Sequence, residues 1–189
     1  MRANTAEYEL IAPSTLEDVL STLAKGAHTP IAGGTELMVA LAAGRLPRQP
    51  LLSLHHLTEL RFIETHPTHV VIGSGTTFTD LRNHPAIAAD LPLLVQAASW
   101  TGSIANQNRG TLGGNIVNAS PAADSPPALL AYDAEIKIVS VTGTRAIPYK
   151  EFHLGYKKTA LQPGELVHSI SVPRVWTGYR SYIRKVGAR

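Results

Sequence analysis

The 189-residue sequence contains no cysteine, and this absence excludes several kinds of site. Without thiols the chain forms no disulfide, and it supplies no thiolate ligand for zinc or for an iron–sulfur cluster. Any iron–sulfur cluster that works together with this protein must therefore come from a partner chain.

Long apolar runs and strong charge are also missing. No apolar run approaches the ~20 residues that span a bilayer, and residues 1–9 contain no apolar signal core. The net charge is only +3, and the basic residues are spread along the chain, which argues against nucleic acid as the main partner. Because 44% of the residues are hydrophobic and 16% are charged, we expect a globular, cytoplasmic protein without a membrane span.

Several common signatures of catalysis and phosphate binding are absent. No serine stands in a Gly-x-Ser-x-Gly elbow, no lysine directly follows a glycine pair as in a Walker loop, and the Rossmann spacing Gly-x-Gly-x-x-Gly does not occur. Of the eight histidines only His55 and His56 are adjacent, and adjacent side chains point to different sides of a strand or helix. Nucleophilic hydrolysis, NTP hydrolysis and metal binding are therefore disfavoured.

The most informative segment that remains is Arg109–Ser125. It contains three glycines, small residues, side-chain amides and a single carboxylate, with almost no other charge. Such a composition predicts a loop whose backbone can close around a ligand, because glycine allows close approach and unusual backbone angles.

A shorter glycine segment, Gly33–Glu36, follows the apolar run 29–32. This order predicts a strand, a turn and a helix over 36–43, with Thr35 as its N-cap. The junction would point unpaired N–H groups and the positive end of a helix dipole outward, which suits a phosphate. Ordinary turn chemistry is the alternative explanation for the same residues.

The remaining pattern predicts strands and helices on both sides of a division near residue 57. Strands are expected at residues 8–13, 29–32, 51–54, 60–64, 69–73, 134–140, 144–147, 167–172 and 180–186. The strands 60–64 and 69–73 are expected to form a hairpin that turns at 66–68, and the strand 134–140 is expected to pair with 144–147 across residues 142–143. Besides the helix over 36–43, helices are expected after a Ser14–Glu17 capping box, near 80–83 with Thr77 or Thr79 as cap, at 87–100 and at 126–132, where Asp124 and Ser125 hold capping positions.

Three motifs occur in an order that is found in one family. They are Ala32–Leu37, the run from Asn108 through Asp124, and the Gly-Tyr-Lys-Lys-Thr segment Gly155–Thr159. Together they resemble the FAD-binding (medium) subunits of the molybdenum hydroxylases, the xanthine dehydrogenase and carbon monoxide dehydrogenase type. The resemblance implies an α+β fold of two subdomains, 1–57 and 58–175, of the vanillyl-alcohol oxidase-like type, with FAD between them.

The same resemblance implies roles for individual residues. Backbone amides of Ala32–Glu36 and Thr111–Asn115 would bind the pyrophosphate from both subdomains, with the hydroxyls of Thr35 and Thr111 adding hydrogen bonds. Asp124 would accept from sugar or ribityl hydroxyls, and Lys158 would stabilise the anionic reduced flavin. The alternatives are a helix cap for Asp124 and a solvated surface lysine for Lys158. The implied cofactor-binding residues are Ile31, Ala32, Gly33, Gly34, Thr35, Glu36, Leu37, Asn108, Thr111, Gly113, Gly114, Asn115, Asp124 and Lys158.

The resemblance also implies a function that needs partners. Non-covalent FAD would pass electrons from the iron–sulfur clusters of one partner subunit to NAD or another acceptor, and the molybdenum cofactor would lie on a further subunit. Two features depart from the family: Ile104–Gln107 replaces the usual Pro-Gln-Ile-Arg, and residues 176–189 resemble the start of a C-terminal domain that is truncated here. The alternative function is a nucleotide-binding module without redox partners.

Overall fold

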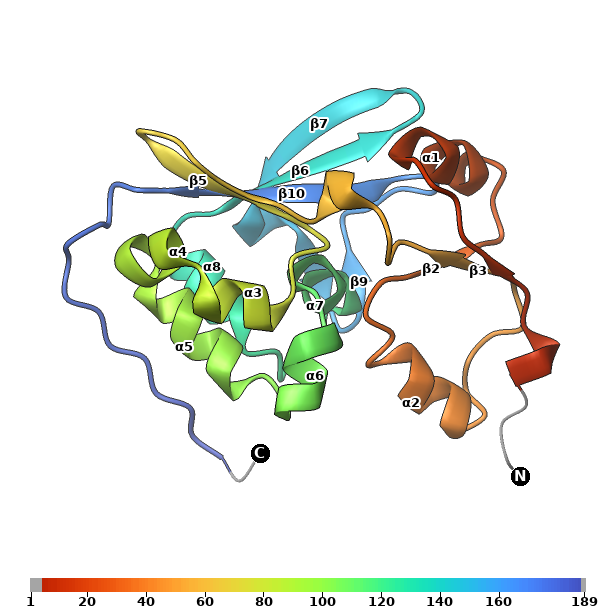
Figure 1. The fold of residues 1–189 in the computed structure, drawn as a ribbon, viewed down its shortest axis with the longest axis horizontal. Coiled ribbons are helices and arrows are strands. Elements are labelled where there is room, and N and C mark those ends of the chain that lie inside the picture. Colours follow the sequence, from red (N-terminus) through yellow and green to blue (C-terminus); the bar gives the residue numbers. More distant parts are fainter. Residues whose placement is uncertain (1–4, 188–189) are drawn as a thin grey trace.

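Two sheets of different construction and a short hairpin organise the chain (Figure 1). The computed structural model describes residues 5–187, so the ends 1–4 and 188–189 of the predicted segments lie outside the described residues. The N-terminal sheet has the order β1-β3-β2, and both of its strand pairs are parallel. Its strands and helices are η1 (Thr5–Glu7), β1 (Leu10–Ile11), α1 (Leu16–Ala24), β2 (Thr29–Ile31), α2 (Leu37–Ala42) and β3 (Leu51–Ser53).

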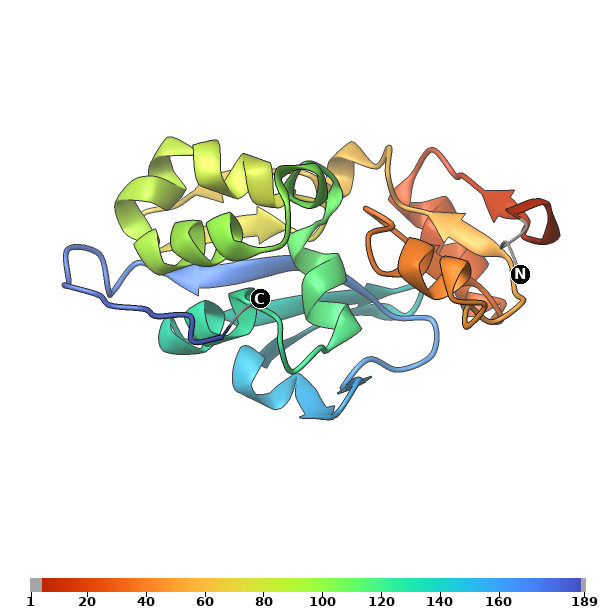
Figure 2. The ribbon, with the colours of Figure 1, turned by 90° about the horizontal axis from the view of Figure 1, so that it is seen from below.

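The second sheet has five antiparallel strands in the order β4-β5-β10-β6-β7, and a separate two-stranded hairpin pairs β8 with β9. Helices α3–α8 lie on one face of the five-stranded sheet (Figures 1 and 2). The elements of this part are η2 (Thr58–Leu60), β4 (Ile63–Thr65), β5 (His69–Gly73), α3 (Phe78–Asn83), α4 (Pro85–Asp90), α5 (Pro92–Trp100), α6 (Ile104–Arg109), α7 (Leu112–Asn118), α8 (Ser125–Ala131), β6 (Glu135–Ser140), β7 (Gly143–Pro148), η3 (Tyr149–Glu151), β8 (His153–Gly155), β9 (Lys158–Thr159) and β10 (Leu166–Pro173).

Two clusters of buried apolar side chains hold these parts in place. The larger cluster fills the space between the five-stranded sheet and its helices, and it includes Ile72, Leu94, Leu112 and Ile170. The second cluster joins the N-terminal sheet to the five-stranded sheet. Its fully or nearly buried members are Val19, Leu23, Leu52, Leu57, Leu60, Val139 and Leu166. Burial of this second cluster sets the position of β2 relative to the helical layer.

Several predictions from the sequence pattern are confirmed. The hairpin turning at residues 66–68 is present, because β4 pairs with β5 and the His66 N–H donates to the His69 carbonyl at 2.8 Å. The second predicted pair is present as β6 and β7. Thr77, one of the two candidate caps, caps α3, and Asp80 completes its capping box.

Two helix starts differ from the prediction. Helix α1 is capped by Thr15, whose hydroxyl accepts from the Asp18 N–H at 3.1 Å, and not by the predicted box one residue earlier. The Glu59 carboxylate reaches the first N–H group of α1 from a distant part of the chain, which the local pattern does not reveal. Helix α2 begins at Leu37, and Thr35 does not cap it.

The predicted helix over 87–100 is two helices, α4 and α5. Pro92 has no N–H group and disfavours helical angles at the residue before it, so Leu91 adopts φ −130° and ψ 53° and the chain turns. The predicted strand over 180–186 is also wrong, because within the described residues this segment pairs with no strand. Among the described helices, none is both long and apolar enough to cross a bilayer.

The segment after β10, residues 174–187, runs past the helical layer without regular secondary structure (Figure 1). An ion pair with a buried carboxylate holds its start: the Nε atom of Arg174, whose side chain is 31% exposed, lies 2.9 Å from Asp90 Oδ2, and Nη2 donates to Oδ1 at 3.3 Å. The Asp90 side chain is only 5% exposed. Thr177 adds a longer contact to the same carboxylate. Asp90 at the end of α4 therefore anchors the segment.

Replacing Arg174 with alanine tests this anchor. The change leaves a buried carboxylate without its cation, so we expect the free energy of unfolding to fall by about 3 kcal/mol in a urea titration. Arg48→Ala is the matched control, since Arg48 is 78% exposed in its pair with Glu7 and its loss should cost less than about 1 kcal/mol. Equal losses in the two variants would contradict the anchor.

Candidate functional site

The turn that follows β2 presents a row of unpaired backbone donors. In a parallel sheet the carboxyl ends of the strands meet at one edge, and Gly33–Glu36 lies at that edge. Gly34 has φ +74°, a backbone conformation that favours glycine. Within residues 5–187, the four N–H groups of this turn have no hydrogen-bond partner. Four consecutive donors are therefore free for water or an anion.

The segment Arg109–Ser125, predicted as a loop, is largely helical. Helix α6 ends at Arg109, Gly110 and Thr111 form a corner, and α7 follows. Small and amide-bearing residues fit both a loop and a helix, and packing decides between them: Leu112 and Ile116 of α7 are fully buried in the larger core. The expected ligand loop is thus a helix–helix corner.

The first turn of α7 has few free donors. The N–H groups of Leu112 and Gly113 donate, both at 2.9 Å, to carbonyls of the segment between β5 and α3. The N–H of Gly114 donates to the Thr111 hydroxyl at 3.1 Å. Among residues 111–115 of the described chain, only Thr111 keeps an N–H group without a partner. Gly113 is buried and permits close packing, while Gly114 is exposed.

The two glycine segments touch each other. A Cβ atom at Gly33 would lie 1.9 Å from the Arg109 carbonyl oxygen and 2.9 Å from the Gly110 Cα, so only glycine fits at this position. Figures 1 and 2 both show the start of α2 beside the α6–α7 corner. The structure therefore brings the free donors of the first segment against the second segment.

Asp124 is held by a lysine from the far end of the chain. Lys185 Nζ lies 2.8 Å from Asp124 Oδ1 and 3.0 Å from Oδ2, and it also reaches the Trp100 carbonyl at 3.4 Å. Asp124 occupies the N-cap position of α8, but its side chain makes no capping hydrogen bond. The cap explanation of Asp124 is thus wrong. Lys185 was not recognised in the sequence, where it is one cation of a basic segment without a motif.

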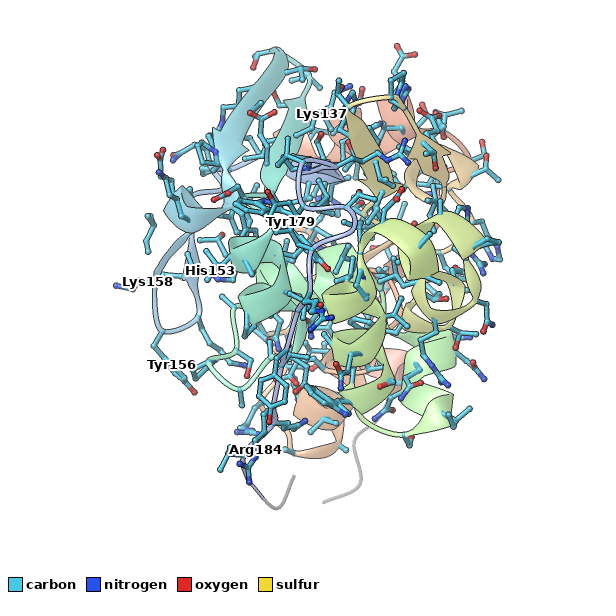
Figure 3. All side chains as sticks on the ribbon, turned by 90° about the vertical axis from the view of Figure 1, so that its left-hand side faces the viewer. Lys137, His153, Tyr156, Lys158, Tyr179 and Arg184 are labelled. Atoms are coloured by element: carbon cyan, nitrogen blue, oxygen red, sulfur yellow. The ribbon has the colours of Figure 1, made fainter. Side chains whose placement is uncertain are left out.

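The Gly155–Thr159 motif places Lys157, and not Lys158, beside the first glycine segment. Lys157 Nζ lies 3.0 Å from Glu36 Oε1 and 3.3 Å from Asn118 Oδ1. The Lys158 side chain is exposed and makes no hydrogen bond or ion pair within residues 5–187, and Figure 3 shows it at the outer rim of the molecule. This position agrees with the alternative explanation of Lys158 as a solvated surface lysine.

The other predicted site residues have structural partners. Ile31 and Leu37 pack against the third apolar cluster, which lies between α2 and the N-terminal sheet. The Asn108 amide oxygen accepts from the Thr79 hydroxyl, and the Asn115 amide oxygen accepts from Ser125, both at 2.5 Å. These two amides brace the ends of α6 and α8. Ala32 is half-buried directly before the turn.

Positive charge gathers at the same sheet edge. His55 follows β3, and burial, then the neighbouring charges of Arg109, His56 and Arg61, lowers its pKa below the ordinary value. A lowered pKa favours the neutral imidazole at pH 7. Arg109 lies near His55, and Lys157 Nζ lies 3.0 Å from Glu36 Oε1, so both bring a cationic side chain to this edge.

A buried amide fixes the helix that leads into the corner. Gln107, which stands in the segment that departs from the family pattern, is 2% exposed. It accepts from Arg82 at 2.6 Å and donates to the Ser99 carbonyl at 3.0 Å. These hydrogen bonds of the Gln107 side chain tie α6 to α3 and to the end of α5.

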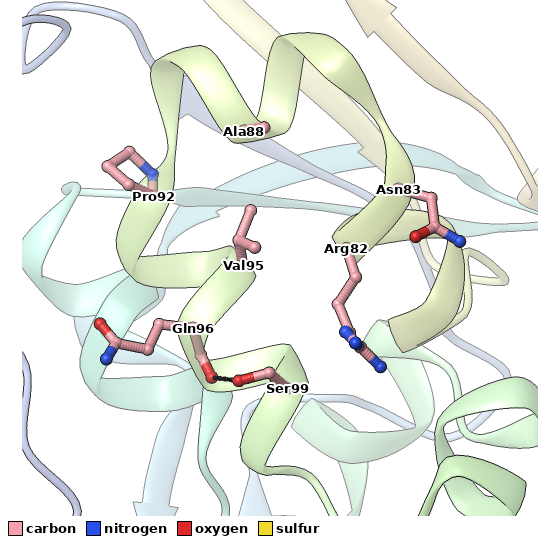
Figure 4. A pocket seen from close by; sticks show the side chains of 7 residues that line it. All are labelled: Arg82, Asn83, Ala88, Pro92, Val95, Gln96 and Ser99. Carbon is pink, nitrogen blue, oxygen red and sulfur yellow. Dashed lines mark hydrogen bonds between the residues drawn. The ribbon is translucent and has the colours of Figure 1, made fainter.

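The surface of the described chain has a hollow over the helical layer and another beside the β8–β9 hairpin. One, of about 420 Å³, lies over α3–α5 beside Arg82 and is lined by none of the predicted cofactor-binding residues (Figure 4). The other, of about 380 Å³, lies between residues 119–127 and the β8–β9 hairpin. On its wall His153 Nε2 contacts the Ile116 carbonyl oxygen at 2.8 Å, which ties the hairpin to α7.

Comparison with known proteins gives one consistent result. Residues 6–175 match the family model of the FAD-binding domain in molybdopterin dehydrogenases. The glyceraldehyde dehydrogenase medium chain of Sulfolobus acidocaldarius is 33% identical, over 97% of this chain and 65% of its own length. A putative xanthine dehydrogenase FAD-binding subunit of Escherichia coli is 35% identical, over 85% of this chain and 56% of its own length.

A solved structure agrees with the sequence matches. Carbon monoxide dehydrogenase from Hydrogenophaga pseudoflava, in a form lacking the molybdenum-pyranopterin moiety, superimposes with a TM-score of 0.85 and 31% identity, over 88% of this chain and 58% of that chain. The chain thus spans less than two thirds of the length of these proteins.

Gly33→Ala tests the contact between the two glycine segments. The added methyl group would meet backbone atoms, which cannot rotate away, so we expect the free energy of unfolding to fall by about 2 kcal/mol or more. Gly155→Ala is the control, since a Cβ there has no atom within 4 Å and should change stability by less than about 1 kcal/mol. Urea unfolding measures both, and a Gly33→Ala variant as stable as the control would show that the segments do not touch.

Proposed function

This chain belongs to the family of FAD-binding domains of molybdopterin dehydrogenases, and from this membership we propose that it is the FAD-binding, electron-transfer subunit of a molybdenum hydroxylase. The observation that carries the proposal is the contact of Gly33 with the Arg109–Gly110 corner, because it places four free N–H groups against the second glycine segment. When bound, FAD supplies the redox chemistry that would connect iron–sulfur clusters of a partner subunit with NAD or another acceptor.

The first glycine segment is the proposed pyrophosphate site. Its four N–H groups have no partner within residues 5–187, and Gly34 adopts the positive φ that the turn requires, so these donors are available to phosphate oxygens. The second segment was expected to bind the pyrophosphate through the backbone N–H groups of Thr111–Asn115. Most of these N–H groups already donate to other groups of the chain, so the segment contributes differently. We assign it the free Thr111 N–H, the Thr111 hydroxyl and the open backbone at Gly114, which form the opposite wall.

Asp124 and Lys185 are the proposed contacts to the polar groups further along FAD. A carboxylate accepts strongly from two hydroxyls, and the Lys185 ammonium, 2.8 Å from Asp124 Oδ1, orients this carboxylate. An ammonium has three N–H donors, so Lys185 can donate to Asp124 and to the Trp100 carbonyl and keep one donor for the cofactor. The cofactor would be held without a covalent bond, since the chain has no cysteine and no histidine in a recognisable attachment motif.

We propose that the reaction with the organic substrate takes place on partner subunits. Within residues 5–187, no group of three or more metal-binding side chains could hold a metal ion, and the sequence supplies no thiolate for an iron–sulfur cluster. We therefore assign the clusters and the molybdenum cofactor to other subunits of a hetero-oligomer. The chain described here would position the flavin and tune its potential.

The absorbance spectrum of the purified chain tests the proposal. We expect a yellow protein with flavin bands, and release of FAD from it by denaturation because no covalent bond holds the cofactor. A colourless preparation should take up added FAD and melt at a higher temperature. A colourless protein that FAD fails to stabilise would overturn the proposal and favour a nucleotide-binding module without redox partners, for which ADP should then give stabilisation.

Two substitutions test the assigned residues. Asp124→Asn removes the charge that accepts from hydroxyls and should raise the dissociation constant for FAD about tenfold. Gly114→Val places bulk on the open wall, where even a Cβ lies 3.0 Å from the Thr111 hydroxyl, and should weaken binding further. Asp133→Asn, an exposed residue with φ +52°, is the charge-matched control. Fluorescence titration of apoprotein with FAD measures all three, and unchanged affinity in both site variants would refute the assignment.

A further inference from the structure

Lys157 lies at the tip of the β8–β9 hairpin and joins three parts of the chain. Its ammonium contacts Glu36, 121 residues earlier, and Asn118 at the end of α7. Its own N–H donates to the Ala119 carbonyl at 3.3 Å. Lys157 and Ala119 both have positive φ, +50° and +46°, which is unfavourable for side chains other than glycine. The surrounding contacts hold this lysine in a conformation that it would not adopt alone.

The Glu36 carboxylate is unfavourably placed for a phosphate site unless a cation accompanies it. Glu36 is the last residue of the turn that carries the four free N–H groups. Two negative groups a few ångströms apart repel each other, and the repulsion grows where a ligand excludes water. The pyrophosphate of a dinucleotide adds two negative charges at this turn. The cation that forms an ion pair with Glu36 is Lys157.

The ion pair between Lys157 and Glu36 contributes little to the stability of the folded chain. The side chains of Lys157 and Glu36 are 43% and 53% exposed, and exposed pairs contribute at most about 1 kcal/mol. An anionic ligand at the same turn would depend on the pair much more, because the ammonium offsets Glu36 and attracts the ligand. Two of the three ammonium donors are used, by Glu36 and Asn118, and the third is free.

We propose that Lys157 is a pyrophosphate-binding residue, which neutralises Glu36 and directs its remaining N–H donor to the dinucleotide. This inference rests on the proposed function and deepens it. It adds Lys157 as a contact to the pyrophosphate, whereas the motif resemblance gives Lys158 a role at the flavin ring. It also explains why a carboxylate can stand at the end of a phosphate-binding turn.

Lys157→Met is the principal test, in the full chain. We expect its dissociation constant for FAD to rise about tenfold at low salt, because a charge-assisted hydrogen bond is lost. The difference from wild type should shrink in 0.5 M salt, which screens charges. Lys157→Arg should retain most of the affinity. Lys150→Met is the matched control, since the Lys150 side chain is exposed and makes no hydrogen bond or ion pair in the described part of the chain.

A second substitution separates a binding role from a structural one. In the Lys157→Met background, Glu36→Gln should recover part of the FAD affinity, because it removes the carboxylate that the lysine had neutralised. The melting temperature of the apoprotein should change little in either variant. A lysine that only fastened the hairpin would give no such recovery.

The outcomes distinguish the two proposals. A wild-type chain that fails to bind FAD overturns the proposed function and this inference together. A wild-type chain that binds FAD, with Lys157→Met binding equally well at low salt, overturns the inference alone.

Discussion

The contact between Gly33 and the carbonyl of Arg109 is the constraint on which the candidate site depends. No side chain fits between the two backbones, so the turn after β2 and the α6–α7 corner lie at a fixed distance. Behind the contact, the apolar cluster that includes Leu52, Leu57 and Leu166 joins the two sheets. Because packed apolar interfaces resist sliding, the free N–H groups keep one position relative to α7.

Both carboxylates of the candidate site are paired with lysines. Glu36 is paired with Lys157, and Asp124 with Lys185, and each lysine comes from a segment more than fifty residues away. Burial and nearby cations lower the pKa of His55, so this ring is less often protonated at neutral pH than an ordinary histidine. Such pairs leave ammonium donors free for a ligand while limiting the repulsion that isolated cations would create. The arrangement suits an anionic dinucleotide that must be held firmly but without a covalent bond.

Sequence reasoning succeeded where the signal is local and failed where partners are distant. The β4–β5 and β6–β7 hairpins follow from alternation and turn residues, and the family follows from three ordered motifs. The helical character of Arg109–Ser125 was missed, because small residues and amides fit a loop equally well and the buried faces of α7 decide. The cap of α1 was misplaced by one residue, since the carboxylate of Glu59 also satisfies its first turn. The subdomain boundaries near residues 57 and 175 and the cofactor-binding residues stay predictions.

The sequence by itself determined the chemistry of the candidate site: glycines that admit a phosphate, one carboxylate within the long segment, and no cysteine for a cluster or a covalent flavin. Only the tertiary structure decided which of these groups meet. It showed that the amides after β2 are free while most of those of α7 are paired, and that Lys157 and Lys185 face the carboxylates. The reason is physical: hydrogen bonds and ion pairs depend on positions in space, and burial of apolar faces from the whole chain sets those positions.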